Sequence, residues 1–565
     1  MNVSLASGLI ESRYAVAARF SRIRSDGYRQ NAFTDMYSYF LTATRFDSGM
    51  TTKLVVLGGP ERTGLAYFGV PQQALETDRT QNDFGKFDTD NFNQPVYQLI
   101  HEWTVSPNMV VSNMLYHIKG DGFYTQQLFG DALSTYRLGN FKVSDSLLYP
   151  PDFYEQDASG ALIKDAGGFY TITRSDVITK RSLDLSDYGW IPQLTWQHTR
   201  GRLLIGGELR LHTGRHFGEL QSGNALPIST APNQLYYDYD TYRTSGVFYL
   251  SENVQLTPEI NLNADLRLQA MRYGVAADRF DQLKYSLNYF FVNPRVGINI
   301  NAAENLSIYA SLGSVQREPT LSSFQFEGQL PLFKKVDPAQ GIYEEPLLKP
   351  EQMLDAEIGA AWREKNWSIK AGVYGMDFQN ELVFGGQLND VGLPIYGNAE
   401  RTRHLGFELD LALQTGVGLD FTGNLNVSQN TFVRYTEYGY DAAGNITAAV
   451  LDGKTIALNP SVIANVRAKY AYKNFYVSAA VQAVGRQYFD NTETPERSSD
   501  PYAVMNLNVS YRFENVFFSQ AEVSAVINNV WDARYETSGV IDYFGSPRWF
   551  VGAPRNVFLT LRLSL

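Results

Sequence analysis

The sequence predicts an all-β fold, a transmembrane antiparallel β-barrel, and three observations lead to this prediction. Apolar and polar residues alternate over segments of about ten residues, and short and long connections alternate along the chain. No uninterrupted apolar stretch of roughly 18 residues or more occurs, so no transmembrane helix is expected. The start, from Met1 to Leu9, also lacks the basic-then-apolar pattern of a signal peptide. A barrel is the one route into a bilayer that the sequence leaves open.

The alternation is clearest between Arg403 and Gln414. The apolar face holds Leu405, Phe407, Leu409, Leu411 and Leu413, and the polar face holds His404, Gly406, Glu408, Asp410 and Gln414. Because successive strand side chains point to opposite faces, we expect the first set to meet lipid and the second to face the interior. The pattern recurs in residues 203–211, 354–362, 505–513 and 557–565. Strands of a soluble sandwich also alternate, but they are usually about half as long.

The connections predict an orientation. The short ones are rich in turn-forming residues and lie at 46–49, 105–108, 199–201, 257–259, 301–305, 363–366, 415–418, 473–474 and 514–515. The long ones lie near 61–93, 119–187, 214–240, 317–350, 381–401, 433–460 and 535–554. Outer-membrane barrels have short periplasmic turns and long extracellular loops, so we expect the long connections to lie outside the cell.

Counting back from the C-terminal strand gives about 21 strands in this chain. The first would run toward the periplasm through Val3 to Ile10 and turn at Glu11 to Arg13. Bacterial single-chain barrels have even strand numbers, so the full barrel is expected to have about 22 strands, a size whose lumen is plugged. We therefore expect residues 1–565 to form a barrel domain, with one outward-running strand and a plug domain absent from this chain.

Composition excludes several classes of function. The net charge of -11 lacks the basic surplus of nucleic-acid-binding proteins, so no nucleic acid is expected as a partner. The chain has no cysteine, and its 6 histidines lack the spacing of a zinc hydrolase. Barrels fill their interiors with polar side chains, and this accounts for the inner carboxylates Glu208, Asp355, Glu357, Glu408 and Asp410. We expect no enzyme activity.

The long connections are rich in aromatic residues, with arginines nearby. Aromatic faces with a few convergent polar groups are typical of a small-ligand pocket, although the same residues could simply pack the loops together. The candidate ligand-binding residues are Phe123, Tyr124, Arg215, Tyr236, Tyr237, Tyr239, Arg317, Phe324, Phe326 and Arg548.

One acidic run offers hard oxygen ligands. Asp83, Asp88 and Asp90 could hold a calcium ion between loops, but they lack the regular spacing of a calcium-binding loop. A solvated acidic loop is the alternative, and we expect no other cofactor.

Several short segments resemble one known family. They are Arg24-Ser-Asp-Gly-Tyr28, Asp90-Asn-Phe-Asn-Gln94, Gly120-Asp-Gly-Phe-Tyr124, Lys349-Pro-Glu-Gln352 with Asp355-Ala-Glu-Ile-Gly359, Gly397-Asn-Ala399 with Leu405-Gly-Phe-Glu-Leu409, Asn528-Asn-Val-Trp-Asp-Ala-Arg-Tyr535 and Gly552-Ala-Pro-Arg555. Their order on the alternating segments resembles the barrel domain of TonB-dependent outer-membrane receptors. That family imports iron-siderophore complexes, cobalamin, haem, other metal complexes and some glycans. Members usually carry an N-terminal plug and a TonB box, and this sequence shows neither.

The resemblance implies a function and a location. We expect an integral barrel in the outer membrane of a Gram-negative bacterium that binds a scarce nutrient, such as an iron-siderophore or similar chelate, and imports it with TonB-coupled energy. The implied partners are outer-membrane lipid and lipopolysaccharide, a plug domain, the TonB complex and a small substrate such as a ferric siderophore or cobalamin. Two alternatives remain open, a passive porin-like or structural barrel that works without a plug and a soluble carbohydrate-binding β protein.

Overall fold

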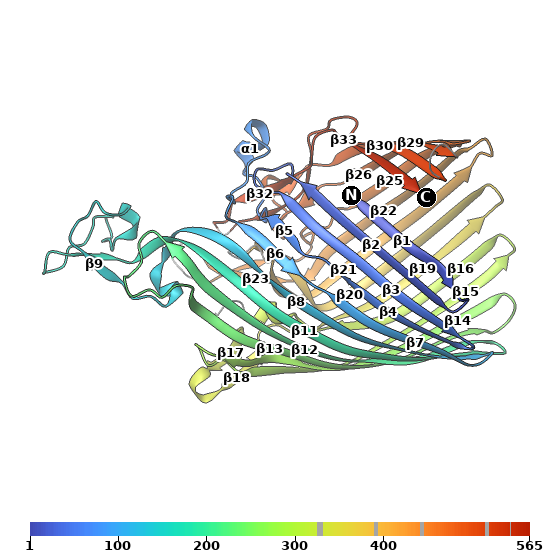
Figure 1. Cartoon of the computed structure of the whole chain (residues 1–565), viewed down its shortest axis with the longest axis horizontal. Coiled ribbons are helices and arrows are strands. Elements are labelled where there is room, and N and C mark those ends of the chain that lie inside the picture. The colour runs from blue at the N-terminus through green and yellow to red at the C-terminus, as the bar shows by residue number, and fades with distance from the viewer. Residues whose placement is uncertain (325–330, 389–393, 441–445, 515–518, 543, 565) are drawn as a thin grey trace.

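The chain forms one large, tilted β-sheet that curls into a barrel (Figure 1). The computed structural model describes residues 1–324, 331–388, 394–440, 446–514, 519–542 and 544–564. The main sheet has 25 strands in the described residues; β5, β6, β31 and β32 are short additions at one end, and the other 21 form the wall. The predicted fold class and strand number are confirmed.

The wall strands pair antiparallel with their neighbours in the order of the chain, as the pairings from β1 to β33 show. They are β1 (Asn2–Ile10), β2 (Tyr14–Ser25), β3 (Thr34–Asp47), β4 (Met50–Gly58), β7 (Val96–Ser106), β8 (Met109–Ala132), β11 (Arg174–His198), β12 (Gly201–Gly223), β13 (Gln234–Gln255), β14 (Ile260–Asp278), β15 (Tyr285–Ala303), β16 (Leu306–Arg317), β19 (Glu351–Arg363), β20 (Trp367–Leu388), β21 (Pro394–Gln414), β22 (Leu419–Arg434), β25 (Val462–Tyr472), β26 (Phe475–Val484), β29 (Tyr502–Glu514), β30 (Gln520–Asn528) and β33 (Asn556–Ser564).

The remaining elements belong to the long connections. They are β5 (Glu61–Gly64), α1 (Gln72–Thr77), β6 (Thr89–Asn93), η1 (Leu133–Tyr136), β9 (Phe141–Val143), η2 (Pro151–Phe153), β10 (Tyr170–Ile172), α2 (Leu321–Phe324), β17 (Phe333–Asp337), η3 (Pro338–Gln340), β18 (Ile342–Pro346), β23 (Thr436–Tyr440), β24 (Ile446–Val450), β27 (Gln487–Tyr488), η4 (Pro495–Arg497), β28 (Ser498–Ser499), β31 (Glu536–Ile541) and β32 (Pro547–Val551). All of them lie at one end of the barrel, which we call the loop end, and the short turns lie at the other, the turn end (Figure 1).

The two faces of the wall can be assigned from contacts between strands that are not neighbours, because such side chains meet only on the concave side. The hydroxyl of Tyr116 on β8 donates to Oε1 of Glu208 on β12 at 2.7 Å, across β11. Tyr116 and Glu208 therefore point inward. Leu209 and Leu211, which alternate with Glu208, are 56% and 55% exposed on the outward face. This is the arrangement that the alternation predicts.

Three of the predicted long connections are shorter than the prediction, because their strands continue. The one predicted at 381–401 begins after Leu388 and ends before Pro394. The connection predicted at 119–187 begins after Ala132 and ends before Arg174, and the one at 214–240 covers only the residues between Gly223 and Gln234. Near the loop end the outward face of these strands is polar as well, as Lys180 and Asp184 on β11 and Arg215 on β12 show. The apolar-polar alternation that marks a strand in lipid is therefore lost, although backbone pairing continues.

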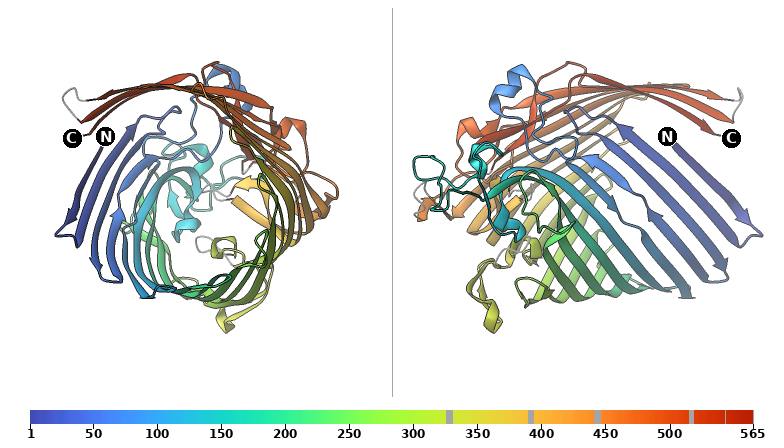
Figure 2. Two further views of the ribbon diagram at one scale, coloured as in Figure 1. Left: turned by 90° about the vertical axis from the view of Figure 1, so that its right-hand side faces the viewer. Right: turned by 60° about the vertical axis from the view of Figure 1, so that its left-hand side comes forward.

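The barrel wall has two unpaired edges among the described residues. β1 pairs with β2 and β33 pairs with β30, and β1 and β33 do not pair with each other. In Figure 2 the opening lies between the first strands, coloured blue, and the last strands, coloured red. Because 21 consecutive wall strands alternate in direction, β1 and β33 run the same way. A direct pair between them would be parallel in an otherwise antiparallel wall. The turn predicted at Glu11 to Arg13 follows β1 as expected.

Candidate functional site

The inward face of β8, β11 and β13 near the loop end carries an arginine held by two tyrosines. Arg181 is 5% exposed; its Nε donates to the hydroxyl of Tyr236 at 3.0 Å, and its Nη1 donates to the hydroxyl of Tyr124 at 3.2 Å. Burying a charged guanidinium is costly unless hydrogen bonds compensate, and these phenols supply part of that compensation. Two predicted residues, Tyr124 and Tyr236, are thus brought together around an arginine that the sequence analysis did not single out.

The three predicted tyrosines of β13 pack against other aromatic rings. Tyr236 makes edge contacts with Tyr136 and Tyr237, with ring centroids 5.1 and 5.0 Å apart, and Tyr239 stacks on His216 at 5.1 Å. Each of the three is at most 7% exposed. They share one apolar cluster with Phe324 on α2, also among the predicted residues. These residues pack together, as the alternative interpretation expects; whether they also contact a ligand stays a prediction.

A segment between β16 and β19 covers this aromatic wall. We call it the covering segment and define it as residues 318–324 and 331–350. Glu318 accepts a hydrogen bond from Nη2 of Arg243 on β13 at 2.6 Å, and the hydroxyl of Tyr273 on β14 donates to the carbonyl of Pro319. Farther along, Phe333 packs edge-on against Tyr285 of β15, with ring centroids 5.2 Å apart. A solute that reached the tyrosines would have to displace this segment.

Arg317 lies at the loop end of β16, on the inward face. Its Nε lies 2.8 Å from Oε1 of Glu351 at the start of β19, and its side chain is 63% exposed. Arg317 is an even number of residues from Tyr309 and therefore lies on the same face of β16. Tyr309 lines an inward hollow of about 540 Å³ together with Glu357 and His404. Arg317 is therefore the predicted arginine that is most open to the lumen.

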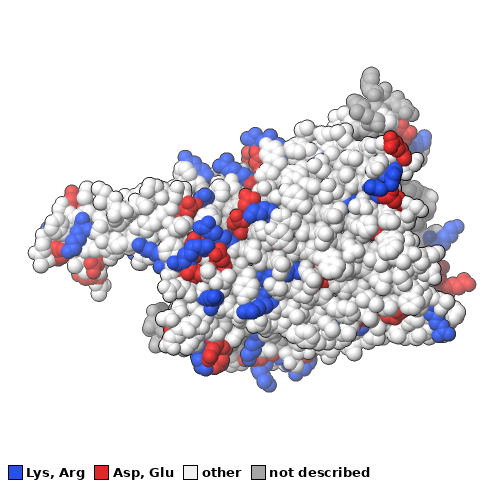
Figure 3. Space-filling model, turned by 60° about the horizontal axis from the view of Figure 1, so that its bottom comes forward, with Lys and Arg blue, Asp and Glu red and all other residues white. Residues whose placement is uncertain are grey.

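Phe123 and Arg215 do not face the lumen. Phe123 follows Leu115 by an even number of residues on β8, and Arg215 follows Leu211 on β12, so both share the outward face of those exposed leucines. Phe123 lies beneath the ammonium group of Lys180, and Arg215 forms a two-pronged ion pair with Asp238. The prediction placed them in long connections; they lie instead on continued strands, which turn them outward. In Figure 3, charged side chains gather between the mostly uncharged wall and the protruding loops.

The remaining arginine and the acidic run belong to contacts between loops. Arg548 on β32 lies 2.9 Å from Asp542 and 3.2 Å from Asp83. Asp88 is buried and accepts hydrogen bonds from the backbone N–H groups of Gly85 and Gln127 at 2.5 and 2.6 Å. Burial raises the pKa of Asp88, and these two donors oppose the shift.

The calcium expectation gains no support from this geometry. Asp83 and Asp88 use their carboxylates in the contacts above, and Asp90 lies half-buried on β6. In the described ranges no group of at least 3 histidine, aspartate or glutamate side chains is placed to hold a metal ion. Phe326, the last predicted residue, lies outside the described residues.

Sequence reasoning also missed polar pairs on the inner wall. Asp187 on β11 accepts from Nε of Arg210 at 2.7 Å and lies 3.0 Å from Nδ1 of His212. On the opposite wall, Nε2 of His404 lies 3.2 Å from Glu381. The two-residue alternation of β11 and β20 could have placed these residues on the inner wall. It was hard to recognise because polar residues occupy both faces of these strands near the loop end.

With the barrel and its inner wall described, comparison with known proteins decides the family. The model of the family described as TonB dependent receptor-like, beta-barrel, matches residues 17–530. The chain belongs to this family. The predicted resemblance is confirmed, and the protein is placed in the outer membrane of Gram-negative bacteria, with the loop end facing outward. The family and its fold are those of transport receptors rather than enzymes.

Solved structures of import receptors and a transporter share the fold at low identity. The ferric-catecholate import receptor Fiu from E. coli K12, in its closed form, is 16% identical with a TM-score of 0.67, and the match covers 99% of this chain and 80% of Fiu. The siderophore receptor PiuA from Acinetobacter baumannii is 15% identical with a TM-score of 0.71, covering 100% and 79%. The copper transporter OprC is 12% identical with a TM-score of 0.70, covering 100% and 80%. A search of curated protein sequences found no match.

Helices contribute little to this TonB-dependent receptor barrel. In the residues that the structure describes, no helix is long and apolar enough to cross a membrane.

Proposed function

We propose that this barrel binds an iron-siderophore or similar metal chelate outside the cell and imports it with energy supplied through TonB. The observation that carries the proposal is the family membership of residues 17–530. Similar structures include a ferric-catecholate import receptor, a ferric citrate transporter and a copper transporter, so metal complexes are the substrate class that they suggest.

The inner wall at the loop end suits such a substrate. Many ferric siderophores are anionic, and an arginine offers a delocalised charge and several N–H donors in a fixed geometry. Arg317 presents a largely exposed guanidinium to the lumen, and Arg243 and Arg181 lie deeper, beside tyrosines. Substrate would first meet Arg317 and the covering segment, and displacement of that segment would open the aromatic wall.

Coupling requires partners beyond these residues. In this proposal a plug domain closes the lumen, and the TonB complex acts on the plug from the periplasm. Polar side chains on the inner wall could hydrogen-bond to a plug. Two of them are Glu408 and Asn426, and Nδ2 of Asn426 lies 3.3 Å from Oε1 of Glu408. The lipid and lipopolysaccharide of the outer membrane surround the wall.

Uptake measurements separate this proposal from a passive barrel. Cells that produce the receptor from its natural gene are given radiolabelled iron as catecholate, hydroxamate or citrate complexes, with labelled cobalamin as a further probe. We expect saturable uptake of one chelate class that stops when a protonophore collapses the proton gradient. Uptake that never saturates and ignores the protonophore would indicate a passive barrel instead.

A further inference from the structure

Arg243 on β13 holds a carboxylate of the chain itself on the lumen side of the wall. Its Nη2 donates to Oε1 of Glu318, the first residue of the covering segment, at 2.6 Å. Arg243 lies on the same face of β13 as Val247, which pairs with the inward-pointing Glu208. The side chains of Arg243 and Glu318 are 33% and 13% exposed. A solute in the lumen can therefore reach Arg243, but it meets a guanidinium that is already paired.

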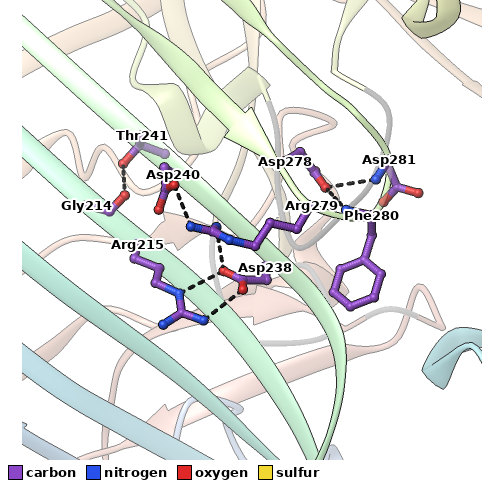
Figure 4. A network of polar contacts seen from close by, with 9 residues as sticks. All are labelled: Gly214, Arg215, Asp238, Asp240, Thr241, Asp278, Arg279, Phe280 and Asp281. Carbon is purple, nitrogen blue, oxygen red and sulfur yellow. Dashed lines mark hydrogen bonds and ion pairs between the residues drawn. The ribbon is translucent and has the colours of Figure 1, made fainter.

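This ion pair uses one of the two prongs that the guanidinium offers to a carboxylate. Nε and Nη2 of an arginine lie side by side and match the two carboxylate oxygens. Arg215 holds Asp238 through both, at 2.9 and 2.8 Å (Figure 4), and Arg401 holds Asp377 at 2.9 Å through each. Nε of Arg243 is instead buried without an acceptor among the residues that the structure describes. A carboxylate that reached both donors would therefore bind Arg243 more tightly than its present partner does.

Tyr273 on β14 holds the next residue of the covering segment. It pairs with Arg243 across the two strands, and its hydroxyl donates to the carbonyl of Pro319. Its ring centroid lies 6.0 Å from Cζ of Arg243, and the ring stacks on Tyr289 with centroids 5.8 Å apart. Two neighbouring side chains of the wall thus hold two consecutive residues of the covering segment. A carboxylate that takes the place of Glu318 would find the phenol of Tyr273 as a second donor close by.

We propose that Glu318 is a built-in competitor for substrate at Arg243, and that the substrate is a metal chelate with a free carboxylate. This inference rests on the proposed import function and narrows its substrate class. A carboxylate replaces Glu318 without a change of charge, and its second oxygen can bond the buried Nε. In catecholate and hydroxamate complexes the metal binds the chelating oxygens, whereas polycarboxylate complexes such as ferric citrate keep carboxylate oxygens free. Chelates without a free carboxylate leave Glu318 in place.

The first test compares two neutralising substitutions in the covering segment. Glu318→Gln removes the competing charge, and Glu344→Gln makes the same change on β18, where Glu344 pairs with Lys335. The plug-complete receptor is purified from cells and titrated with ferric citrate, a ferric hydroxamate and a ferric catecholate. We expect ferric citrate to bind most tightly, and Glu318→Gln to raise its affinity by at least about fivefold. Glu344→Gln should leave that affinity unchanged.

Two further measurements test the arginine and the contact separately. Arg243→Lys keeps the positive charge but loses the fork, so it should weaken ferric citrate binding by at least about fivefold. Hydrogen exchange needs no substrate, and the backbone amides of residues 320–324 should exchange faster in Glu318→Gln than in Glu344→Gln. Each variant is first checked for the compact mobility of an unheated barrel on a gel.

The outcomes separate this inference from the import proposal. Equal affinity of Glu318→Gln and Glu344→Gln for ferric citrate would overturn the role of Glu318. Saturable, protonophore-sensitive uptake of a chelate without a free carboxylate would overturn the substrate class and leave import standing. Binding of none of the three complexes, together with faster exchange in Glu318→Gln, would overturn the import of iron chelates and support the contact alone.

Discussion

Val70 and Trp549 exchange two backbone hydrogen bonds although they come from opposite ends of the sheet. The N–H of Val70 donates to the carbonyl of Trp549 at 2.8 Å, and the N–H of Trp549 donates to the carbonyl of Val70 at 2.9 Å. Val70 precedes α1 in the connection between β5 and β6, and Trp549 lies on β32. The loop end therefore joins the two sides of the wall at which β1 and β33 remain unpaired.

Other contacts reinforce this junction, which we call the loop clasp and define as residues 65–88 with β31 and β32. Arg79 donates to Glu536 and to the carbonyl of Tyr535, both at 2.7 Å. Val70, Trp549 and Phe489 also share an apolar cluster. The clasp holds the two edges of the wall at a fixed place at the loop end.

Removing the buried ring of the clasp should loosen it. Trp549 is 6% exposed, and its indole N–H donates to the carbonyl of Ser498 at 3.0 Å, so Trp549→Ala should lower the free energy of unfolding by about 3–5 kcal/mol. Trp531→Ala is the control, because Trp531 is 53% exposed. Urea unfolding followed by fluorescence measures both.

A second variant separates loss of the clasp from loss of packing. A Cβ at Gly69 would lie 2.6 Å from the backbone of Trp549, so Gly69→Ala should push this segment away from β32 and leave the indole in place. Faster protease cleavage near residue 70 is the expected result. If Gly69→Ala and Trp549→Ala both left cleavage and unfolding unchanged, the clasp would have no role in holding the edges.

The unpaired edges predict the outcome of disulfide trapping. A disulfide needs Cα atoms within about 7 Å, whereas one intervening strand would separate β1 from β33 by roughly 10 Å. We therefore expect cysteines at Leu5 and Leu561 not to cross-link in the folded receptor. Cysteines at the paired positions Val523 and Leu561 should cross-link and serve as the control. Efficient joining of Leu5 to Leu561 would mean that β1 and β33 pair directly.

The two faces of β21 should respond differently to substitution. The outward face of this strand carries Leu409, and Leu409→Arg near mid-membrane should cost roughly 2–4 kcal/mol. Glu408→Gln on the inward face keeps a polar side chain in a polar lumen and should cost much less. Unfolding midpoints in detergent or lipid vesicles measure the difference, and equal midpoints would show that the faces are assigned the wrong way round.

Asp88 should make stability depend on pH. Burial raises its pKa above the ordinary value near 4, so its stabilising contribution is complete below that pH and is lost as the pH rises through the raised folded value. Asp88→Asn cannot ionise. The heat-denaturation midpoint of the variant should therefore rise relative to that of the unaltered receptor as the pH increases above about 4. A difference that stays constant with pH would contradict the raised pKa.

The sequence predicts a strand and the direction of its side chains only where apolar and polar residues alternate along the chain. In β21, lipid covers one face, so Leu405 and Glu408 reveal the strand and its orientation. On β12 the apolar face ends at Leu211, and nothing in the composition shows that the strand continues to Gly223. The direction of Arg215 depends on that continuation. The partners of Arg181 could not be predicted either, because they come from β8 and β13, and only the pairing register brings them together.

The final prediction uses that difference in direction to test the binding site. Arg215 and Arg317 are both exposed arginines paired with a buried carboxylate, but Arg215 faces outward and Arg317 faces the lumen. If substrate enters through the lumen, Arg317→Ala should remove a charge-assisted contact worth about 1–3 kcal/mol, which is roughly five- to 150-fold in affinity. Arg215→Ala should leave affinity unchanged, because its side chain lies on the outward face, where it pairs with Asp238. Titration of each receptor with the chelate identified by the uptake assay measures both. Equal losses would point to an indirect effect on the wall, and a loss confined to Arg215→Ala would place the substrate outside the lumen.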